Sequence, residues 1–569
     1  MKRGRGGIRE IEFYAQAHQM IWGGRDERLR APATLDALAA LTEAGHVSQG
    51  DAMLLADSYR LFRRIEHRLQ MVEDQQTHLV PKQKLAREAI AALDGAPDWK
   101  ALESDLVHRS REVARLYDKL IAVGDDEGGP RGPRIPHAPD DVERWAAQAR
   151  LADPALATSL IASWRRGRAR SLRAPESRRA FEVVLPGLLT ALGRGPGGRE
   201  AMLRLDRMIG ALPYGVQVWR LLKAHPELAE TLARLLTATP WLADSLAARP
   251  QRLDVLLSPP PPLETVEDAL AELHHAVRGL GEEAFLDRVR VWTHERQFHA
   301  AVSLLDGAAS PLAVARLLSL LAEAAVVVLA EQVEAGFAAR HGIVPESEFV
   351  ALALGRFGGG ELTFQSDLDL VFLFTGDWKA SSDGIEPITA SARWNRFATR
   401  LVAALSVPTA AGRLHEVDTR LRPSGADGLL AVSLDSFTTY QTRDAELWET
   451  MALTRARPIT GSRQARAAAK DAIAAIIRGP HQSEKVLREA QAIRAHMAAH
   501  KPSSGPMDLK LGRGGLVDLE FVVQARALLA GQPVPADLAG AARIVAPELV
   551  EAAILLSSAL VVLRLVEPA

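Results

Sequence analysis

The sequence predicts a mainly α-helical protein that contains one α/β domain. Over most of the chain Ala, Leu, Arg and Glu dominate, and apolar residues recur at intervals of three and four, the period of a helix with one buried face. Short apolar runs bounded by glycines and polar residues gather between residues 349 and 421, as expected of strands. With 569 residues the chain is too long for a single hydrophobic core, so we expect several domains.

The N-terminal half is expected to be helical. Residues 1–123 predict a helical bundle, with apolar stripes over residues 34–41 and 51–71. Glycines, prolines and acidic residues then break every pattern, which favours a linker over residues 124–139. A second helical region over residues 140–258 ends at consecutive prolines, which form a short stiff spacer.

The α/β domain, with helices at its start, is expected over residues 263–483. A serine before a proline, Ser310 and Pro311, predicts the start of a long helix that ends near Gly342. The helical pattern returns after this domain and continues to the end of the chain. The strands are predicted over residues 349–354, 368–374 and 414–421, and the C-terminal helical domain over residues 484–569.

Composition narrows the class of protein. A formal net charge of −1 argues against a protein that coats nucleic acid. Because the chain has no cysteine, disulfides, thiolate nucleophiles and cysteine-based zinc sites are excluded, which suits a reducing cytosol. Glycines and charges follow Met1, and the most lipid-like run, residues 324–330, lies between two glutamates and is far shorter than a membrane span. We therefore expect a cytoplasmic protein with neither a membrane nor a nucleic-acid partner.

One motif occurs twice, at opposite ends of the chain. Residues 2–13 and 510–521 share seven identities and three conservative exchanges over twelve positions, centred on Gly-Arg-Gly-Gly. This spacing is much longer than that of a solenoid and indicates a duplicated pair of domains. We expect that the chain begins within one copy, and that the core preceding the motif in the second copy has no counterpart at the N-terminus.

Two closely spaced carboxylates follow a glycine-rich segment in the α/β domain. Asp367 and Asp369 are two residues apart at the start of a predicted strand, so they project to one face while Leu368 faces the other way. Carboxylates this close repel each other unless a cation neutralises them, and Mg²⁺ prefers such oxygen ligands. The preceding glycines, Gly358, Gly359 and Gly360, permit close approach of backbone N–H groups to a polyphosphate, and a helix opening at Gly359 or Gly360 would add its positive end. The simpler reading, that these acids merely end a strand, is disfavoured by this clustering.

A third carboxylate is predicted on the strand over residues 414–421. On a strand Asp418, Arg420 and Arg422 would share one face, with an acid for a metal and two guanidiniums for phosphate oxygens. Glu416 is better explained as a solvated acid at the strand edge than as a further ligand.

These segments resemble a known family. Residues 355–374 carry Gly-Gly followed by Ser-Asp-Leu-Asp, which is similar to the nucleotidyltransferase superfamily typified by DNA polymerase β. More closely, the chain resembles the glutamine synthetase adenylyltransferase (adenylyl-removing) family. The matching strings lie in residues 355–374, 417–425, 448–458, 212–217 and 246–250 and in both copies of the repeated motif.

The resemblance implies a fold and an activity. The family has two nucleotidyltransferase domains, each followed by a helical domain similar to those of PII uridylyltransferase. One half removes AMP from a tyrosine of glutamine synthetase by phosphorolysis, and the other attaches AMP from ATP, under control of PII signalling proteins and glutamine. For this chain it implies a DNA polymerase β-like nucleotidyltransferase domain flanked by helical bundles, with glutamine synthetase and PII as partners.

The resemblance also implies site residues. Asp367 and Asp369 would coordinate Mg²⁺ on the ATP phosphates, and Asp418 would complete a two-metal site and help to deprotonate the tyrosine. Three departures from the family stand out: the first nucleotidyltransferase core is missing, the C-terminal helical domain is incomplete, and Gln365 replaces a small residue. Implied nucleotide-binding residues are Gly358, Gly359, Gly360, Ser366, Arg420, Arg422, Lys510 and Arg513.

Several roles stay open at the level of sequence. Lys510 and Arg513 either reach the phosphates or pair with Asp518 and Glu520 in a structural hinge. Arg455 and Arg457 either contact nucleotide or pack, and neighbouring Trp448 is expected in the core. For the whole chain, the alternatives are a uridylyl- or RNA-directed nucleotidyltransferase, or a catalytically silent docking module for glutamine synthetase or PII.

Two other motifs do not support the sites they suggest. Gly193, Gly195 and Gly198 have dinucleotide-binding spacing, but a helical pattern precedes them where a strand would be required. His294 and His299 are five residues apart, whereas two zinc ligands on one helical face are four apart.

Overall fold

The computed structural model describes residues 6–23, 26–73, 83–121, 134–196, 198–212, 215–249, 252, 260–505 and 507–567. Most of the predicted linker and the start of the proline spacer lie outside these residues. The predicted class is confirmed, because helices dominate and the strands form one small mixed sheet. The chain divides into two compact units. The first comprises Met1–Arg134, Glu176–Val184 and Val216–Pro226, and the second comprises Ile135–Pro175, Leu185–Gly215 and Glu227–Ala569.

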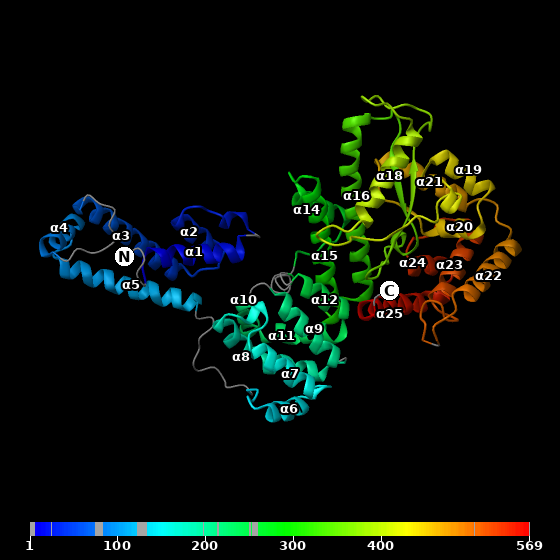
Figure 1. Ribbon diagram of the computed structural model, residues 1–569. Coiled ribbons are helices and arrows are strands. Elements are labelled where there is room, and N and C mark those ends of the chain that lie inside the picture. The colour runs from blue at the N-terminus through cyan, green and yellow to red at the C-terminus, as the bar shows by residue number, and fades with distance from the viewer. Residues whose placement is uncertain are drawn as a thin grey trace. The chain divides into compact units, whose positions relative to one another are not determined.

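The N-terminal part of the first unit is a helical bundle. The long helix α3 packs against α4 and α5, and α1 packs against α2, α3 and α5. The core is continuous and includes Ile11, Leu55 and Phe62, each at most 1% exposed. The bundle predicted in this region is therefore present. Its helices, blue in Figure 1, are α1 (Ile8–Trp22), α2 (Thr34–Glu43), α3 (Gln49–Glu73), α4 (Lys84–Asp94) and α5 (Trp99–Ile121).

Shorter helices occupy the region between residues 139 and 248. Helix α8 contributes to both units, and α10 belongs to the first, where Phe181 and Trp219 lie with ring centroids 4.7 Å apart. Residues up to Arg194 are helical, so the missing strand before the glycine motif is confirmed. The helices are α6 (Pro139–Gln148), α7 (Pro154–Arg165), α8 (Pro175–Arg194), α9 (Gly198–Ala211), α10 (Val216–Ala224), α11 (Pro226–Ala238) and α12 (Pro240–Ala248).

Three helices precede the sheet: α14 (Val266–Val277), α15 (Glu282–Leu305) and α16 (Pro311–His341). Helix α16 confirms the sequence prediction, because Ser310 Oγ accepts a hydrogen bond of 3.3 Å from the Ala313 amide and Gly342 ends the helix at φ 70°. His294 lies on α15, and its Nε2 is 2.9 Å from the Arg413 carbonyl oxygen. Among the described residues, no cluster of metal-binding side chains surrounds it.

The sheet has the strand order β3-β2-β1-β5, with β4 also paired to β2. Strands β1 and β5 run antiparallel to their neighbours, whereas β3 and β4 are parallel to β2. The first two strands fall where the sequence predicted them. The third is much shorter than expected, for a reason given below. The strands are β1 (Phe349–Ala353), β2 (Leu368–Phe374), β3 (Val417–Asp418), β4 (Ala431–Ser433) and β5 (Arg457–Pro458).

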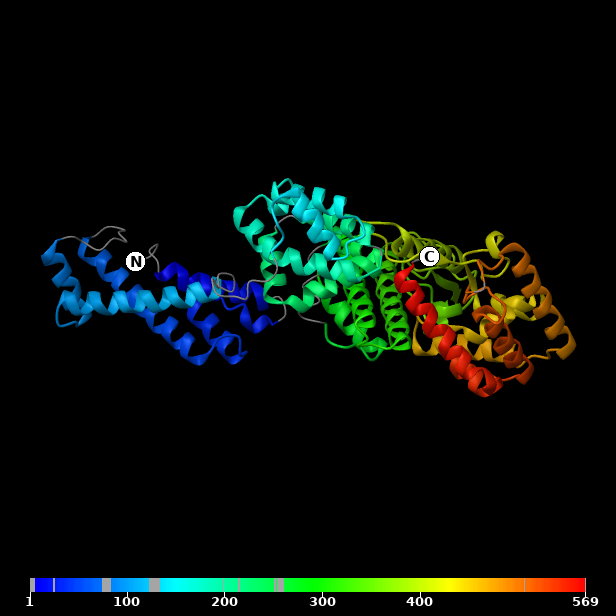
Figure 2. The same cartoon turned by 90° about the horizontal axis from the view of Figure 1, so that it is seen from below.

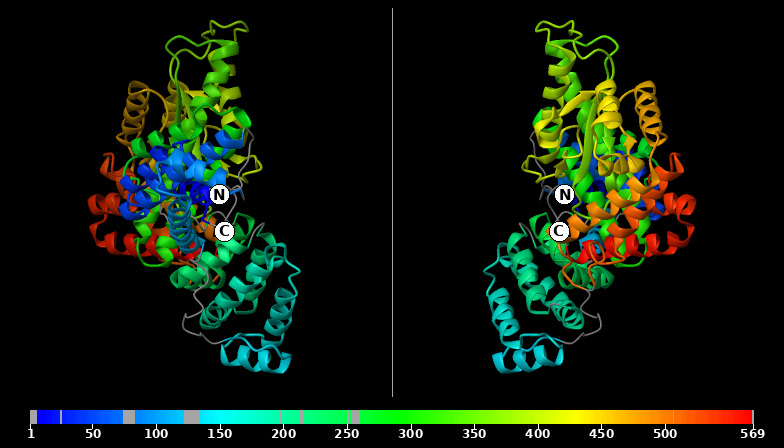
Figure 3. Two further views of the ribbon diagram at one scale, coloured as in Figure 1. Left: turned by 90° about the vertical axis from the view of Figure 1, so that its left-hand side faces the viewer. Right: turned by 90° about the vertical axis from the view of Figure 1, so that its right-hand side faces the viewer.

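Helices cover both faces of the sheet (Figure 3). On one face Phe349 packs against Phe397, with ring centroids 4.5 Å apart, beneath α18. On the other, Val350, Leu352 and Val371 join a core with α19 and α21. Both faces are thus apolar, which explains why β1 reads as a continuous apolar run. The covering helices are α18 (Ala390–Ser406), α19 (Leu434–Arg443) and α21 (Arg463–Ile477), with the short α20 (Leu447–Ala452) between the last two.

The C-terminal region is helical, as predicted, and repeats the local structure of the N-terminus. The helices α1 and α23 both begin directly after the repeated glycines. Gly6 and Gly514 have φ of 71° and 75°. Their amides donate to Glu10 at 2.8 Å and to Asp518 at 2.7 Å, which are equivalent positions. The repeat is thus confirmed as a structural motif. The helices are α22 (Ser483–His500), α23 (Leu516–Ala530), α24 (Leu538–Val545) and α25 (Val550–Val566).

Among the residues that the structure describes, two helical segments are long and apolar enough to cross a membrane by length and composition. In α16 67% of the apolar window is buried within the protein, so α16 serves as a core helix. In the segment Pro547–Val566 28% is buried. This segment includes α25, which packs against α16, α23 and α24 (Figure 2) and leaves Leu555 67% exposed.

Candidate active site

Two carboxylates lie on neighbouring parallel strands. Asp369 is in register with Asp418 at the paired ends of β2 and β3. Leu368 and Leu370 on either side of Asp369 are fully buried, which is the alternation that the sequence predicted. Asp367 precedes β2 and is exposed. The structure therefore places Asp369 and Asp418 side by side, with Asp367 at the mouth of the same site.

The electrostatics of the pair are unequal. The pKa of Asp369 is raised to about 6, chiefly by burial and further by the charges of Asp418 and Asp367. Lys510 and Arg420 oppose this rise. Burial and the two neighbouring carboxylates thus disfavour the charged form of Asp369, a situation that a bound cation would relieve.

Asp418 is held by Arg420, which forms part of a tight turn. The backbone amide and Nε of Arg420 donate to the Asp418 carboxylate at 2.9 and 2.8 Å, and this pairing lowers the pKa of Asp418. Within the described ranges, no three His, Cys, Asp or Glu side chains are gathered closely enough to hold a metal ion. Binding of a metal by all three predicted carboxylates would therefore require Asp418 to turn away from Arg420.

The prediction that Asp418, Arg420 and Arg422 share one strand face is wrong. The chain turns directly after Asp418, because the Arg420 amide bonds back to that side chain and ends the strand. Arg422 then donates to the carbonyl oxygens of Thr419 and Ala426 at 2.9 and 3.0 Å. Arg420 is 78% exposed and faces solvent beside the acids, whereas Arg422 holds the turn together.

The glycine segment ends a short helix and does not open one. Helix α17 (Gly355–Gly358) stops where Gly360 adopts φ 68°, and the Glu361 amide donates to the Arg356 carbonyl oxygen at 2.8 Å. These are features of a glycine-terminated helix end. The predicted helix opening at Gly359 or Gly360 is therefore wrong.

Each glycine meets a different neighbour. A Cβ atom at Gly355 would lie 2.5 Å from Asp369 Oδ2, so this glycine permits the position of the acid. At Gly358 it would lie 2.0 Å from the Arg455 carbonyl oxygen, and at Gly359 2.3 Å from the Arg455 guanidinium. Space remains open at Gly360. Packing against Arg455 thus accounts for two of the glycines, and their predicted role in nucleotide binding stays a prediction.

Ser366 and Lys510 approach the site from separate segments. Ser366 Oγ accepts a hydrogen bond of 3.1 Å from the Thr363 amide in the turn before β2. The charge of Lys510 opposes the rise in the pKa of Asp369, so the repeated loop lies near the carboxylates. Arg513 is exposed. Of the two alternatives left open for these basic residues, the structure does not support pairing with Asp518 and Glu520, because Asp518 pairs with Arg494 and Glu520 with Arg455.

Arg455 and Arg457 both have packing roles. Arg455 pairs with Glu361 and Glu520, and its side chain is 4% exposed. Arg457 pairs with Glu323 of α16 at 2.5 Å. Trp448 was expected in the core but is 38% exposed, because α20 buries the residues that follow it instead.

Sequence reasoning missed the acids that complete the Arg455 cluster. Glu361 comes from the end of the glycine segment and Glu520 from α23. A buried arginine needs such partners, but their identity depends on contacts between distant segments. The buried guanidinium of Arg356 lies near the same charges, with no hydrogen-bond partner in the described part of the chain.

Comparison with known proteins gives the family. The chain is 38% identical over 535 residues to the bifunctional glutamine synthetase adenylyltransferase/adenylyl-removing enzyme of Xanthobacter autotrophicus, a match that covers 92% of this chain and 54% of that relative. Proteins of the same name from Agrobacterium fabrum and Mesorhizobium japonicum are 37% and 35% identical, over 93% and 94% of this chain and 54% and 55% of theirs. The chain belongs to the glutamine synthetase adenylyltransferase family.

Within this adenylyltransferase family the chain spans about half the length of the curated relatives it matches. A family model described as "Glutamate-ammonia ligase adenylyltransferase" matches residues 229–472, which contain the glycine segment and all three predicted carboxylates. A second, described as "GlnD PII-uridylyltransferase", matches residues 1–121. The likeness of the N-terminal helices to that enzyme, implied by the sequence resemblance, is thereby confirmed.

Proposed function

We propose that this chain transfers AMP from ATP to a tyrosine of glutamine synthetase and releases pyrophosphate. The observation that carries the proposal is the in-register pair of Asp369 and Asp418, at one end of the sheet and inside the segment that matches the adenylyltransferase model. The glycine-terminated turn, the acid on β2 and the second acid on a parallel neighbour support a DNA polymerase β-like nucleotidyltransferase core.

The donor set fits Mg²⁺. Asp367, Asp369 and Asp418 provide hard oxygen ligands, and the pKa of about 6 at Asp369 is due first to burial and then to the charges of the other two carboxylates. When bound, the metal supplies positive charge to the oxygens of the triphosphate. These three carboxylates would hold it, with Asp418 released from Arg420.

Phosphate binding and proton transfer depend on residues of the chain. Lys510 and the exposed guanidinium of Arg420 lie beside the acids and would bind phosphate oxygens of ATP. The tyrosine oxygen then attacks the α-phosphorus in line, the bond to the β-phosphate oxygen breaks, and pyrophosphate leaves. As Arg420 moves to the phosphates, the Asp418 carboxylate is released to hold the metal and would accept the tyrosine proton as the hydroxyl approaches it.

The test is transfer of labelled AMP to purified glutamine synthetase by the intact chain. Asp369→Asn and the double variant Asp367→Asn with Asp369→Asn should lose transfer and keep the circular dichroism of the parent. Asp471→Asn, at an exposed aspartate on α21, is the matched control and should retain activity. Mass spectrometry should place AMP on a tyrosine. Full transfer by the folded double variant would overturn the proposal, and a folded but inactive parent would favour a docking module.

The nucleotide is tested in the same assay. ATP should serve as donor and unlabelled UTP should compete weakly. Preferential transfer of UMP, or labelling of a PII protein or RNA in place of glutamine synthetase, would favour the uridylyl- or RNA-directed alternative.

We further propose that PII signalling protein binds the helical part of the chain. The support is the match of residues 1–121 to the PII-uridylyltransferase model. Purified PII should bind the intact chain in calorimetry, and a chain that lacks the matched residues 1–121 should bind it more weakly. Equal binding by both would contradict this assignment.

A further inference from the structure

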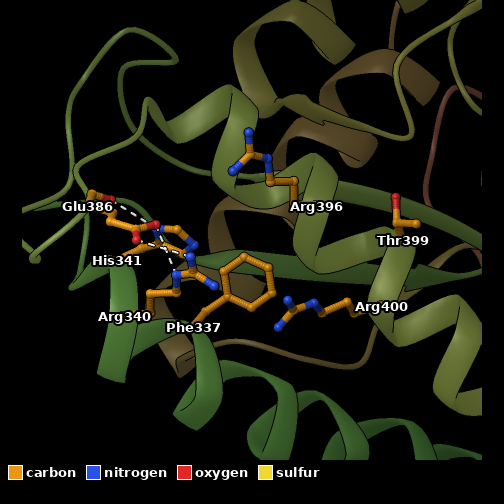
Figure 4. A pocket seen from close by; sticks show the side chains of 7 residues that line it. All are labelled: Phe337, Arg340, His341, Glu386, Arg396, Thr399 and Arg400. Atoms are coloured by element: carbon orange, nitrogen blue, oxygen red, sulfur yellow. Dashed lines mark hydrogen bonds and ion pairs between the residues drawn. The ribbon is translucent and has the colours of Figure 1, made fainter.

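A basic pocket of about 350 Å³ lies between the last turns of α16 and the outer side of α18 (Figure 4). Its volume is that of a site for a small ligand. Helix α16 supplies its wall and base, α18 faces it with polar side chains, and the loop before α18 closes one side. The lining residues are Phe337, Arg340, His341, Glu386, Arg396, Thr399 and Arg400.

The charges in this pocket are not balanced. Arg340 already forms an ion pair with Glu386 through two parallel hydrogen bonds of 2.9 and 3.0 Å. In the described part of the chain, Arg396 and Arg400 have no hydrogen bond or ion pair. Three guanidiniums therefore face one carboxylate. Once Arg340 is paired with Glu386, Arg396 and Arg400 leave the pocket with an excess of two positive charges.

A neighbouring arginine differs from Arg396 and Arg400, whose side chains are exposed to solvent at the pocket. Arg393, on the same helix, is 1% exposed and pairs with Glu334 at 2.6 Å. Arg396 and Arg400 are spaced i,i+4 on α18, so their like charges repel across one helical turn. Arg400 lies over the Phe337 ring, 4.7 Å from its centroid, which fixes one guanidinium beside an apolar surface.

The pocket is separate from the carboxylates. Asp369 lies at the start of β2, whereas Glu386 comes after the far end of that strand. The far end is marked by the hydrogen bond that the Thr375 amide donates to the Glu348 carbonyl oxygen. Five residues of strand between Asp369 and Phe374 correspond to roughly 17 Å. A ligand in the pocket would therefore not touch the acid pair.

We propose that this pocket binds a small dianion, with Arg396 and Arg400 as its principal ligands. Two planar guanidiniums suit the paired oxygens of carboxylate or phosphate groups, and the buried ring of Phe337, which lies between His341 and Arg400 in Figure 4, supports the Arg400 guanidinium from below. The chemical class is a dicarboxylate or a phosphate monoester. The proposal does not depend on the transfer reaction.

The test is calorimetric titration of the intact protein with succinate and, separately, with glycerol 3-phosphate. Saturable binding with a Kd at or below about 1 mM is expected for at least one probe, and the stronger of the two identifies the acidic group. Arg396→Gln with Arg400→Gln should weaken that binding at least about tenfold, the loss of one or two charged hydrogen bonds. The matched control, Arg488→Gln with Arg543→Gln, removes two exposed arginines of α22 and α24 and should leave it unchanged.

A substitution with the opposite expected sign separates binding from damage to the fold. Glu386→Gln removes the carboxylate that occupies Arg340, so a third guanidinium becomes free and affinity should rise several-fold. Absence of saturable binding of both probes, equal weakening by the control pair, or weaker binding by Glu386→Gln would each overturn the proposal.

Discussion

Arg455 and Glu520 form an ion pair of 2.7 Å that joins the sheet domain to α23. The same guanidinium pairs with Glu361 and donates to the Ala536 carbonyl oxygen at 3.1 Å. One buried arginine thus connects the glycine segment with the helices that follow the repeated motif. The sheet domain and the helices that follow it are therefore expected to unfold together.

Replacing Arg455 by methionine tests this connection. The change removes the only guanidinium that is hydrogen-bonded to Glu361 and Glu520 among the described residues, and breaking such a buried pair typically costs about 3–5 kcal/mol of unfolding free energy. Urea denaturation followed by circular dichroism measures the loss. Arg463→Met, at the exposed first turn of α21, is the control and should change the unfolding free energy by less than about 0.5 kcal/mol. A similar small loss for Arg455→Met would show that the cluster does not stabilise the fold.

Gly514 and Gly358 are needed for different reasons, and alanine substitution should give different losses of stability at the two positions. Gly514 has φ 75°, and a Cβ atom added there would have no neighbouring atom within 4 Å, so Gly514→Ala meets only backbone strain, about 1 kcal/mol. At Gly358 the new methyl group would lie 2.0 and 2.5 Å from two carbonyl oxygens, so Gly358→Ala should cost clearly more. Thermal unfolding of the two variants gives the comparison. Equal losses would show that the contacts of Gly358 adjust freely.

The sequence predicted those elements whose signals are local. Ser310 and Gly342 mark the ends of α16 because a cap and a left-handed glycine act within one turn. Strand β2 was found because its apolar residues are contiguous and buried on both faces.

Predictions from the sequence failed where a side chain has several possible hydrogen-bond or ion-pair partners. The alternation after Asp418 favoured a longer strand, yet the Arg420 amide bonds back to that carboxylate and turns the chain. The partners of Arg455 lie 94 and 65 positions away in sequence. No local period encodes such pairs, so the candidate site could be located from the sequence, but its charge pairing could not.

The buried His415 and the half-buried His294 predict how stability depends on pH. Burial is the main cause that lowers the pKa of His415 and of His294 to about 4. In the unfolded chain a histidine titrates near about 6.5, so below that pH the unfolded state binds protons that the native state does not. Stability is therefore fully present above about pH 6.5 and falls as the pH drops towards 4, by up to roughly 1.4 kcal/mol per pH unit for each histidine.

His415→Gln isolates one of these contributions. The variant should be less stable than the parent at neutral pH, because the buried ring is lost, yet its unfolding free energy should fall less steeply between about pH 6.5 and 4.5. Urea unfolding at several pH values measures the slope. His275→Gln, at an exposed histidine of α14, should keep the slope of the parent, and an unchanged slope in His415→Gln would contradict the assignment.

Arg420 and Arg422, which the sequence treated alike, should respond differently to substitution. Arg420 is 78% exposed beside the carboxylates, so under the proposed reaction Arg420→Gln removes a phosphate ligand and should raise KM for ATP about tenfold or more, with little change in thermal stability. Arg422 bonds the Thr419 and Ala426 carbonyl oxygens, so Arg422→Gln should lower the unfolding free energy by about 1–3 kcal/mol through unsatisfied acceptors. Steady-state kinetics and urea denaturation of both variants distinguish the roles. If Arg422→Gln raised KM for ATP as strongly as Arg420→Gln while keeping full stability, both arginines would be nucleotide ligands and the turn would need another source of support.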